Sequence, residues 1–280
     1  MYLNKDLLIY LVMKFFETKF EEYIQSSKKN NLHPELESLT KDIENIYNLD
    51  NNNLIIYGPA GVGKYTQSLN IIEKFSQSKL KYERKINITT LKNKIYNIKI
   101  SDIHFEVDME LLGCNARVLW NDIFKAIIDI LSTRQLHKGI VLCKNFHKIH
   151  NELLDIFYSY MQSLNHKNIS ISYILLTESI SFIPDTIREK CFVLPIKKPT
   201  KTNLKLCFPK KNIDKNITNL KSLQSNDHSY VDFSHSINKN LINFIKNKDV
   251  INLEFRNEIY DIFIYHLDLY KYIWNILEYF

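Results

Sequence analysis

Short apolar segments alternate with longer amphipathic segments through the middle of the chain. The apolar segments have the length of strands and comprise Leu54–Tyr57, Ile103–Asp108, Gly139–Cys143, Ile169–Leu176 and Val193–Ile196. The segments with helical spacing are Lys64–Ser76, residues 115–131 and Asn151–Leu164. Strands separated by helices predict an α/β fold, in which a parallel sheet with right-handed crossovers carries a ligand crevice at the carboxyl ends of its strands.

Two finer patterns surround the second apolar segment. Within 103–108, the apolar side chains of Phe105 and Val107 alternate with the carboxylates Glu106 and Asp108, which predicts a strand. Before it, Lys85–Ile100 has two isoleucine-rich runs on either side of Lys92-Asn93-Lys94. That arrangement predicts a β-hairpin.

The two ends of the chain differ from this middle part in their pattern of apolar and polar residues. Residues 1–50 have apolar positions at helical spacing and are expected to form a helical entry segment to a nucleotide-binding domain spanning 1–198. Residues 199–245 are polar and weakly periodic, and we expect a small lid-like module there. Residues 246–280 return to helical amphipathicity, which predicts helices with an apolar face against a partner subunit.

Composition limits the class of protein. The chain has 280 residues, of which 45% are hydrophobic and 24% charged, and these proportions exclude wholesale disorder. The net charge of +6 is compatible with nucleic-acid contact, although heavy use of Lys, Asn and Ile also points to coding bias. Four widely spaced cysteines indicate reduced intracellular thiols, and the apolar run 7–13 is too short for a spanning helix.

The strand Leu54–Tyr57 runs into a glycine-rich turn that ends in Lys64. This sequence fits the phosphate-binding pattern G-x-x-x-x-G-K-[ST] except at its last position, where Tyr65 replaces the hydroxyl residue that holds Mg²⁺. Backbone N–H groups, the following helix N-terminus and the lysine favour a polyphosphate, so we expect ATP or ADP to bind. The expected nucleotide-binding residues are Gly58, Pro59, Ala60, Gly61, Val62, Gly63, Lys64, Tyr65 and Thr66.

Several motifs in this order resemble one family, the AAA+ small subunits of replication factor C, the eukaryotic sliding-clamp loader. The resemblance covers about residues 50–198 and is closest to the subunit whose P-loop also runs G-K-x-T. It implies a P-loop AAA+ sheet with flanking helices, followed by a reduced lid and collar-like helices. The motifs that carry the resemblance are, in chain order, the P-loop, the isoleucine-rich hairpin, the segment 104–108, the apolar strand before Lys144 and the segment 187–191. Residues 255–261 are also similar to the start of the family's helical collar.

The resemblance also indicates that the catalytic groups are lost. The positions of the Mg²⁺-binding aspartate and the water-polarising glutamate hold Lys144 and Asn145, and the sensor asparagine is Glu178. The arginine that reaches a neighbouring subunit's ATP site corresponds to Lys190, beside Arg188. We therefore expect no catalytic residue and Mg²⁺-poor or Mg²⁺-free binding.

Three assignments remain open from sequence. Lys144 either supplies positive charge near the β- or γ-phosphate or turns to solvent. Arg117, near a helix N-terminus, either contacts DNA phosphates or is a solvated or capping residue. His147 and His150 form a weak His-x-x-His spacing with no second ligand pair, so no metal site is expected.

Three functions compete on this basis. The leading one is a nucleotide-binding, non-hydrolysing subunit of a clamp loader in DNA replication. Its partners would be other loader subunits, the sliding clamp and primer–template DNA, in the nucleus or another replication compartment. The alternatives are a stand-alone P-loop ATPase or nucleic-acid kinase with atypical catalytic residues, and an interaction scaffold with a decayed P-loop.

Overall fold

The computed structural model describes residues 19–37, 52–89, 95–162, 169–207, 233–247, 253–264 and 269–280. The chain divides into two compact units, which are described separately. The first contains the chain up to Gly58 and Lys64–Ile196, and the second contains Pro59–Gly63 and Lys197–Phe280. The apolar run 7–13, the hairpin turn 92–94 and most of the polar region 201–240 lie outside the described residues.

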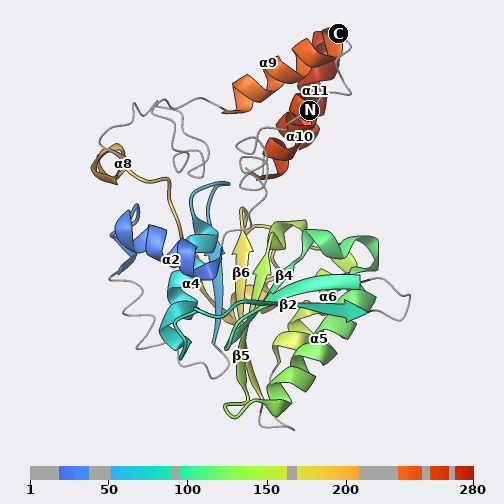
Figure 1. Cartoon of the computed structure of the whole chain (residues 1–280). Coiled ribbons are helices and arrows are strands. Elements are labelled where there is room, and N and C mark those ends of the chain that lie inside the picture. The colour runs from blue at the N-terminus through green and yellow to red at the C-terminus, as the bar shows by residue number, and fades with distance from the viewer. Residues whose placement is uncertain are drawn as a thin grey trace, which may run out of the picture. The chain divides into compact units, whose positions relative to one another are not determined.

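The described part of the first unit is built on a seven-stranded sheet of order β2-β3-β4-β5-β6-β1-β7 (Figure 1). Strands β4, β5, β6, β1 and β7 are parallel, and β3 pairs antiparallel with both β2 and β4. The predicted parallel sheet and the predicted hairpin are thereby confirmed. The strands are β1 (Asn53–Tyr57), β2 (Arg84–Thr89), β3 (Ile95–Ile100), β4 (His104–Asp108), β5 (Lys138–Lys144), β6 (Ser170–Thr177) and β7 (Cys191–Pro195).

Helices cover both faces of this sheet. Figure 1 shows α2 (Phe20–Lys29) and α4 (Lys64–Phe75) on one side, and α5 (Ala116–Thr133) and α6 (Asn151–Met161) on the other. Short helical turns complete the connections: η1 (Glu110–Asn115), η2 (Phe146–Lys148) and α7 (Asp185–Arg188). The predicted α/β class, a mainly parallel sheet with flanking helices, is confirmed.

Aromatic side chains form part of the core between the sheet and helices α5 and α6. Trp120 of α5 lies 5.2 Å from Phe157 of α6, and Phe157 lies 5.6 Å from Tyr173 of β6, measured between ring centroids. The three rings are fully buried, and the Tyr173 hydroxyl donates to the carbonyl oxygen of Tyr160 at 2.9 Å. A buried hydroxyl is thus satisfied by backbone at the end of α6.

The strand predicted at 103–108 is present as β4, and its ionisable residues are buried. His104 and Glu106, which share one face of the strand, are 0% and 3% exposed. The physical reason is that β4 is an interior strand, paired with β3 and β5 and covered on both faces. Glu106 is therefore a carboxylate inside the fold rather than at its surface.

The second unit contains four described helices: α8 (Lys201–Cys207), α9 (Phe233–Lys246), α10 (Leu253–Ile264) and α11 (Leu269–Tyr279). Its apolar contacts centre on Ile237 and Leu241 of α9, Ile262 of α10 and Tyr272 of α11. The predicted helical segment 255–280 is present as two helices. Among the described residues no helix has both the length and the apolar character that crossing a bilayer requires. The four cysteines are free thiols.

Candidate nucleotide-binding site

The glycine-rich turn links the end of β1 to the start of α4. The backbone φ angles are +70° at Gly61 and +91° at Gly63, a left-handed conformation that favours glycine. The Lys64 ammonium donates to the carbonyl oxygen of Gly58 at 2.8 Å. Burial lowers the pKa of Lys64, while the carboxylate of Glu178 raises it. The turn thus has two glycines with left-handed backbones and ends in a lysine at a helix N-terminus.

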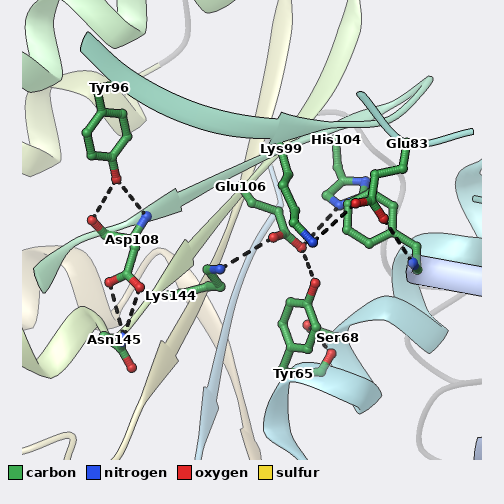
Figure 2. Close-up of polar contacts among 11 residues, drawn as sticks. Tyr65, Ser68, Glu83, Tyr96, Lys99, His104, Glu106, Asp108, Lys144 and Asn145 are labelled. Carbon is green, nitrogen blue, oxygen red and sulfur yellow. Dashed lines mark hydrogen bonds and ion pairs between the residues drawn. The ribbon is translucent and has the colours of Figure 1, made fainter. Parts of the chain in front are cut away.

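Tyr65 occupies the position that should supply a metal-binding hydroxyl. Its hydroxyl instead donates to Oε1 of Glu106 at 2.7 Å (Figure 2). Burial raises the pKa of Tyr65 well above its usual value, and the negative charge of Glu106 raises it further. The hydroxyl therefore stays protonated and committed to a carboxylate of the same chain.

Glu106 of β4 is the centre of a buried polar cluster. Besides the Tyr65 hydroxyl, it has Lys144 Nζ at 3.5 Å from Oε2 and His104 Nε2 at 3.6 Å from Oε1. Burial by itself would raise the pKa of Glu106, but the imidazole of His104 and the charge of Lys144 outweigh it, so the pKa is lowered. Glu106 is accordingly ionised at neutral pH and holds two neighbours in place.

Lys144 ends β5 beside this cluster. Strands β4 and β5 pair in parallel register, with Asp108 opposite Lys144. The ammonium lies 5.6 Å from the centre of the Tyr65 ring, and the side chain is 32% exposed. The interpretation that Lys144 simply turns to solvent is therefore wrong, because its charge is paired with Glu106.

Asn145 follows with a left-handed backbone, at φ +51°. Its side-chain amide donates to both carboxylate oxygens of Asp108, at 3.1 and 3.2 Å. The Tyr96 hydroxyl fixes the backbone of the same aspartate, donating to its carbonyl oxygen and accepting from its N–H (Figure 2). Asn145, which the resemblance places at the water-polarising glutamate, is thus an amide donor to the carboxylate at the end of β4.

A second carboxylate lies near the P-loop lysine. Glu178 follows β6, and its Oε1 lies 3.9 Å from Nε2 of His147, the residue three places after Lys144. Burial lowers the pKa of His147; Glu178 raises it, and Lys148 and Lys64 lower it. His147, Glu178 and Lys64 are thereby electrostatic neighbours. Among the described residues, no group of three or more His, Cys, Asp or Glu side chains could hold a metal ion.

Helix α2 covers the outer side of the cluster. The Phe20 ring lies 4.8 Å from His104, and Tyr23 meets Tyr65 edge-on at 5.1 Å. Neither Glu106 nor His104 was predicted as a site residue from the sequence. The available signal was their i, i+2 spacing. Side chains two positions apart in a strand point to the same face, so the two ionisable groups were bound to be neighbours.

The residues expected to contact partners are exposed side chains of other elements. Arg117 is exposed in the first turn of α5. Arg188 forms an ion pair with Asp185 at 2.5 Å, one turn earlier in α7, and Lys190 is exposed just before β7. Their proposed roles toward DNA or a neighbouring subunit stay predictions.

No protein-family model and no curated protein sequence matches the chain. Among solved structures, it is similar to the Thermotoga maritima RuvB Holliday junction branch migration motor, with 15% identity and a TM-score of 0.39 over 68% of this chain and 51% of RuvB. It is also similar to Saccharomyces cerevisiae RIF2, with 14% identity and a TM-score of 0.41 over 72% and 73% of the two chains. The chain is also similar to C. elegans PCH-2, with 11% identity and a TM-score of 0.39 over 83% of this chain and 66% of PCH-2. The chain spans about half the length of RuvB, and similarities at these scores define neither its family nor its activity.

Proposed function

We propose that this chain is an AAA+-type protein whose P-loop binds ATP or ADP without hydrolysing it. The observation that carries the proposal is the turn itself, with left-handed Gly61 and Gly63 leading into Lys64 at the start of α4. Such a turn presents backbone N–H groups and a lysine to a polyphosphate. The sheet is in line with this, since the P-loop strand β1 is an interior strand of the parallel part.

The groups around the turn support loss of hydrolysis. Phosphoryl transfer to water needs a residue that orients the attacking water and a metal that spreads the developing charge. The positions expected to supply them carry Asn145, which donates to Asp108, and Lys144, which is paired with Glu106. Neither side chain can accept a proton from water in this arrangement.

The finer proposal is a clamp-loader subunit of the replication factor C type. It is supported by the ordered motifs in residues 50–198 and by the isoleucine-rich hairpin of β2 and β3. In this role the chain would join other loader subunits, a sliding clamp and primer–template DNA in the nucleus or another replication compartment. Arg117 would contact DNA phosphates, and Arg188 and Lys190 would face a neighbouring subunit.

Turnover by the purified chain tests the first proposal. ADP and ATP binding should be measurable by calorimetry and should fall at least about tenfold in Lys64→Ala, whereas Lys125→Ala, an exposed change in α5, should bind as the wild type. No ATP turnover that depends on Lys64 is expected. Such turnover in the isolated chain would overturn the non-hydrolysing assignment. Co-purification with a sliding clamp and with loader subunits tests the finer proposal, and its absence would contradict it.

One observation favours the stand-alone ATPase as a second candidate. Glu178 is a partly exposed carboxylate next to His147 and electrostatically coupled to Lys64, so it could orient water in place of the missing glutamate. This alternative predicts turnover that Glu178→Gln abolishes. Under the leading proposal, the wild type and Glu178→Gln are equally inactive.

A further inference from the structure

The P-loop fold normally uses Mg²⁺ together with the nucleotide. The protein contributes few ligands to this ion: the hydroxyl after the P-loop lysine and a carboxylate at the end of an adjacent strand, with phosphate oxygens and waters completing the octahedron. The side chains at these places decide whether the chain can accept the ion.

The residues of this chain do not fit that ion. The hydroxyl of Tyr65 is turned to Glu106, to which it donates a hydrogen bond at 2.7 Å. At the strand end stands the cationic Lys144, which would repel a divalent ion. The neighbouring carboxylate of Asp108 has both oxygens bound by the Asn145 amide.

Lys144 is also fixed in a way that a solvated lysine is not. Its ammonium is anchored by Glu106 at 3.5 Å and lies 5.6 Å from the ring of the residue that follows Lys64. About a third of the side chain remains exposed, so the ammonium keeps donors for a further acceptor. Glu106 in turn accepts a hydrogen bond from the Tyr65 hydroxyl and is flanked by His104 (Figure 2).

We propose that the P-loop takes its nucleoside di- or triphosphate as the metal-free polyanion, with the Lys144 ammonium supplying the positive charge that Mg²⁺ supplies elsewhere. This inference rests on the proposed nucleotide binding. Glu106 acts as a positioning residue, because it touches Lys144 and Tyr65 rather than the ligand. In this arrangement the positive charge beside the phosphates comes from a lysine side chain and not from an exchangeable divalent ion.

The deciding measurement uses the wild-type chain. ADP and ATP affinities are determined by calorimetry with Mg²⁺ and again with EDTA, and the two dissociation constants should agree within about threefold, that is, less than 1 kcal/mol. Affinity that falls tenfold or more (about 1.4 kcal/mol) in EDTA would overturn the inference while leaving the proposed function intact. No binding under either condition would overturn both.

Variants then test the role of Lys144. Lys144→Met should weaken ADP binding about tenfold in EDTA, and Lys144→Arg, which keeps the charge, should restore most of it. Lys125→Met is the matched control and should bind normally. A folded Lys144→Met chain that binds as tightly as the wild type would overturn the assignment of Lys144. Thermal unfolding establishes that each variant is folded.

A gain of metal dependence provides an independent test. The variant Tyr65→Thr/Lys144→Asp/Glu106→Gln restores a hydroxyl and a strand-end carboxylate and removes the buried charge that would repel the new aspartate. Its affinity should rise about tenfold on adding Mg²⁺, in contrast to the wild type. If the folded variant stays indifferent to Mg²⁺, the explanation through Tyr65 and Lys144 is wrong.

Discussion

The hydroxyl of Tyr65 and the carboxylate of Glu106 form a 2.7 Å hydrogen bond between the first turn of α4 and the interior strand β4. It connects the residue that follows the P-loop lysine to a carboxylate that is 3% exposed. In the P-loop pattern the residue after the lysine supplies a hydroxyl to Mg²⁺, whereas the hydroxyl of Tyr65 is hydrogen-bonded to a buried carboxylate of the same chain. The stability of the fold and the chemistry of the site are therefore linked at this pair.

Removing this hydroxyl should destabilise the protein. Tyr65→Phe keeps the ring and its contact with Tyr23 but leaves a buried carboxylate without its donor, so the free energy of unfolding should fall by about 1–3 kcal/mol. Chemical denaturation measures the difference. Tyr82→Phe, at a site 65% exposed, is the control and should change little. Equal stability of Tyr65→Phe and the wild type would show that the bond contributes nothing in solution.

The charge of Glu106 should make stability depend on pH in the acid range. Its pKa is lowered in the folded state, so the carboxylate stabilises the fold fully above the ordinary carboxyl pKa, about 4.3, and this contribution is lost as pH falls through the lower folded value. The wild type should therefore be more stable than Glu106→Gln at pH 7, with the difference shrinking below about pH 4.3. Urea titrations at several pH values measure it. A difference that grows on acidification would contradict the assigned direction of the pKa shift.

At Asn145 a glycine variant should be more stable than an alanine variant. Both Asn145→Gly and Asn145→Ala lose the amide contacts with Asp108, but only alanine is strained at φ +51°. The glycine variant should thus be the more stable by about 1 kcal/mol. At Asn121 inside α5 the order should reverse, with alanine more stable than glycine by about 1 kcal/mol. The same order at both positions would show that the left-handed conformation of Asn145 imposes no constraint.

Gly139 of β5 should tolerate no side chain without rearrangement. A Cβ there would come within 2.8 Å of a Leu131 methyl carbon, and Leu131 is fully buried. Gly139→Ala should lower the free energy of unfolding by about 1–3 kcal/mol through overpacking. Leu131→Val added to it should recover part of the loss, which a double-mutant cycle measures. Strictly additive effects would argue against direct contact.

Much of the fold followed from local sequence patterns. The strands from Leu54–Tyr57 to Val193–Ile196, the helices between them and the hairpin in Lys85–Ile100 were all predicted, because apolar periodicity and turn residues act over a few positions. The glycine-rich turn was predicted for the same reason, since its backbone shape needs glycine at fixed places. The lid-like module at 199–245 and the collar at 246–280 stay predictions.

The buried polar contacts around Glu106 could not be predicted from local sequence patterns. The sequence showed Glu106 only as a carboxylate between apolar residues of a strand, and nothing in its neighbours along the chain identified Tyr65, 41 residues away, as its partner. The helix α2, which covers the cluster with Phe20 and Tyr23, was expected only as part of an entry segment. Each of these contacts joins elements that are distant in sequence and meet only in the folded chain.

The sequence by itself indicated a P-loop-like turn on a parallel sheet with Tyr65 after its lysine, and the family resemblance implied that Lys144 and Asn145 replace the residues of a metal-dependent site. The tertiary structure decided what those residues do: Tyr65 and Lys144 meet at Glu106, and Asn145 secures Asp108. The physical reason is that a charge's partner is set by strand order and register, which are properties of the whole sheet. Residue identity is local, whereas the pairing of buried charges is not.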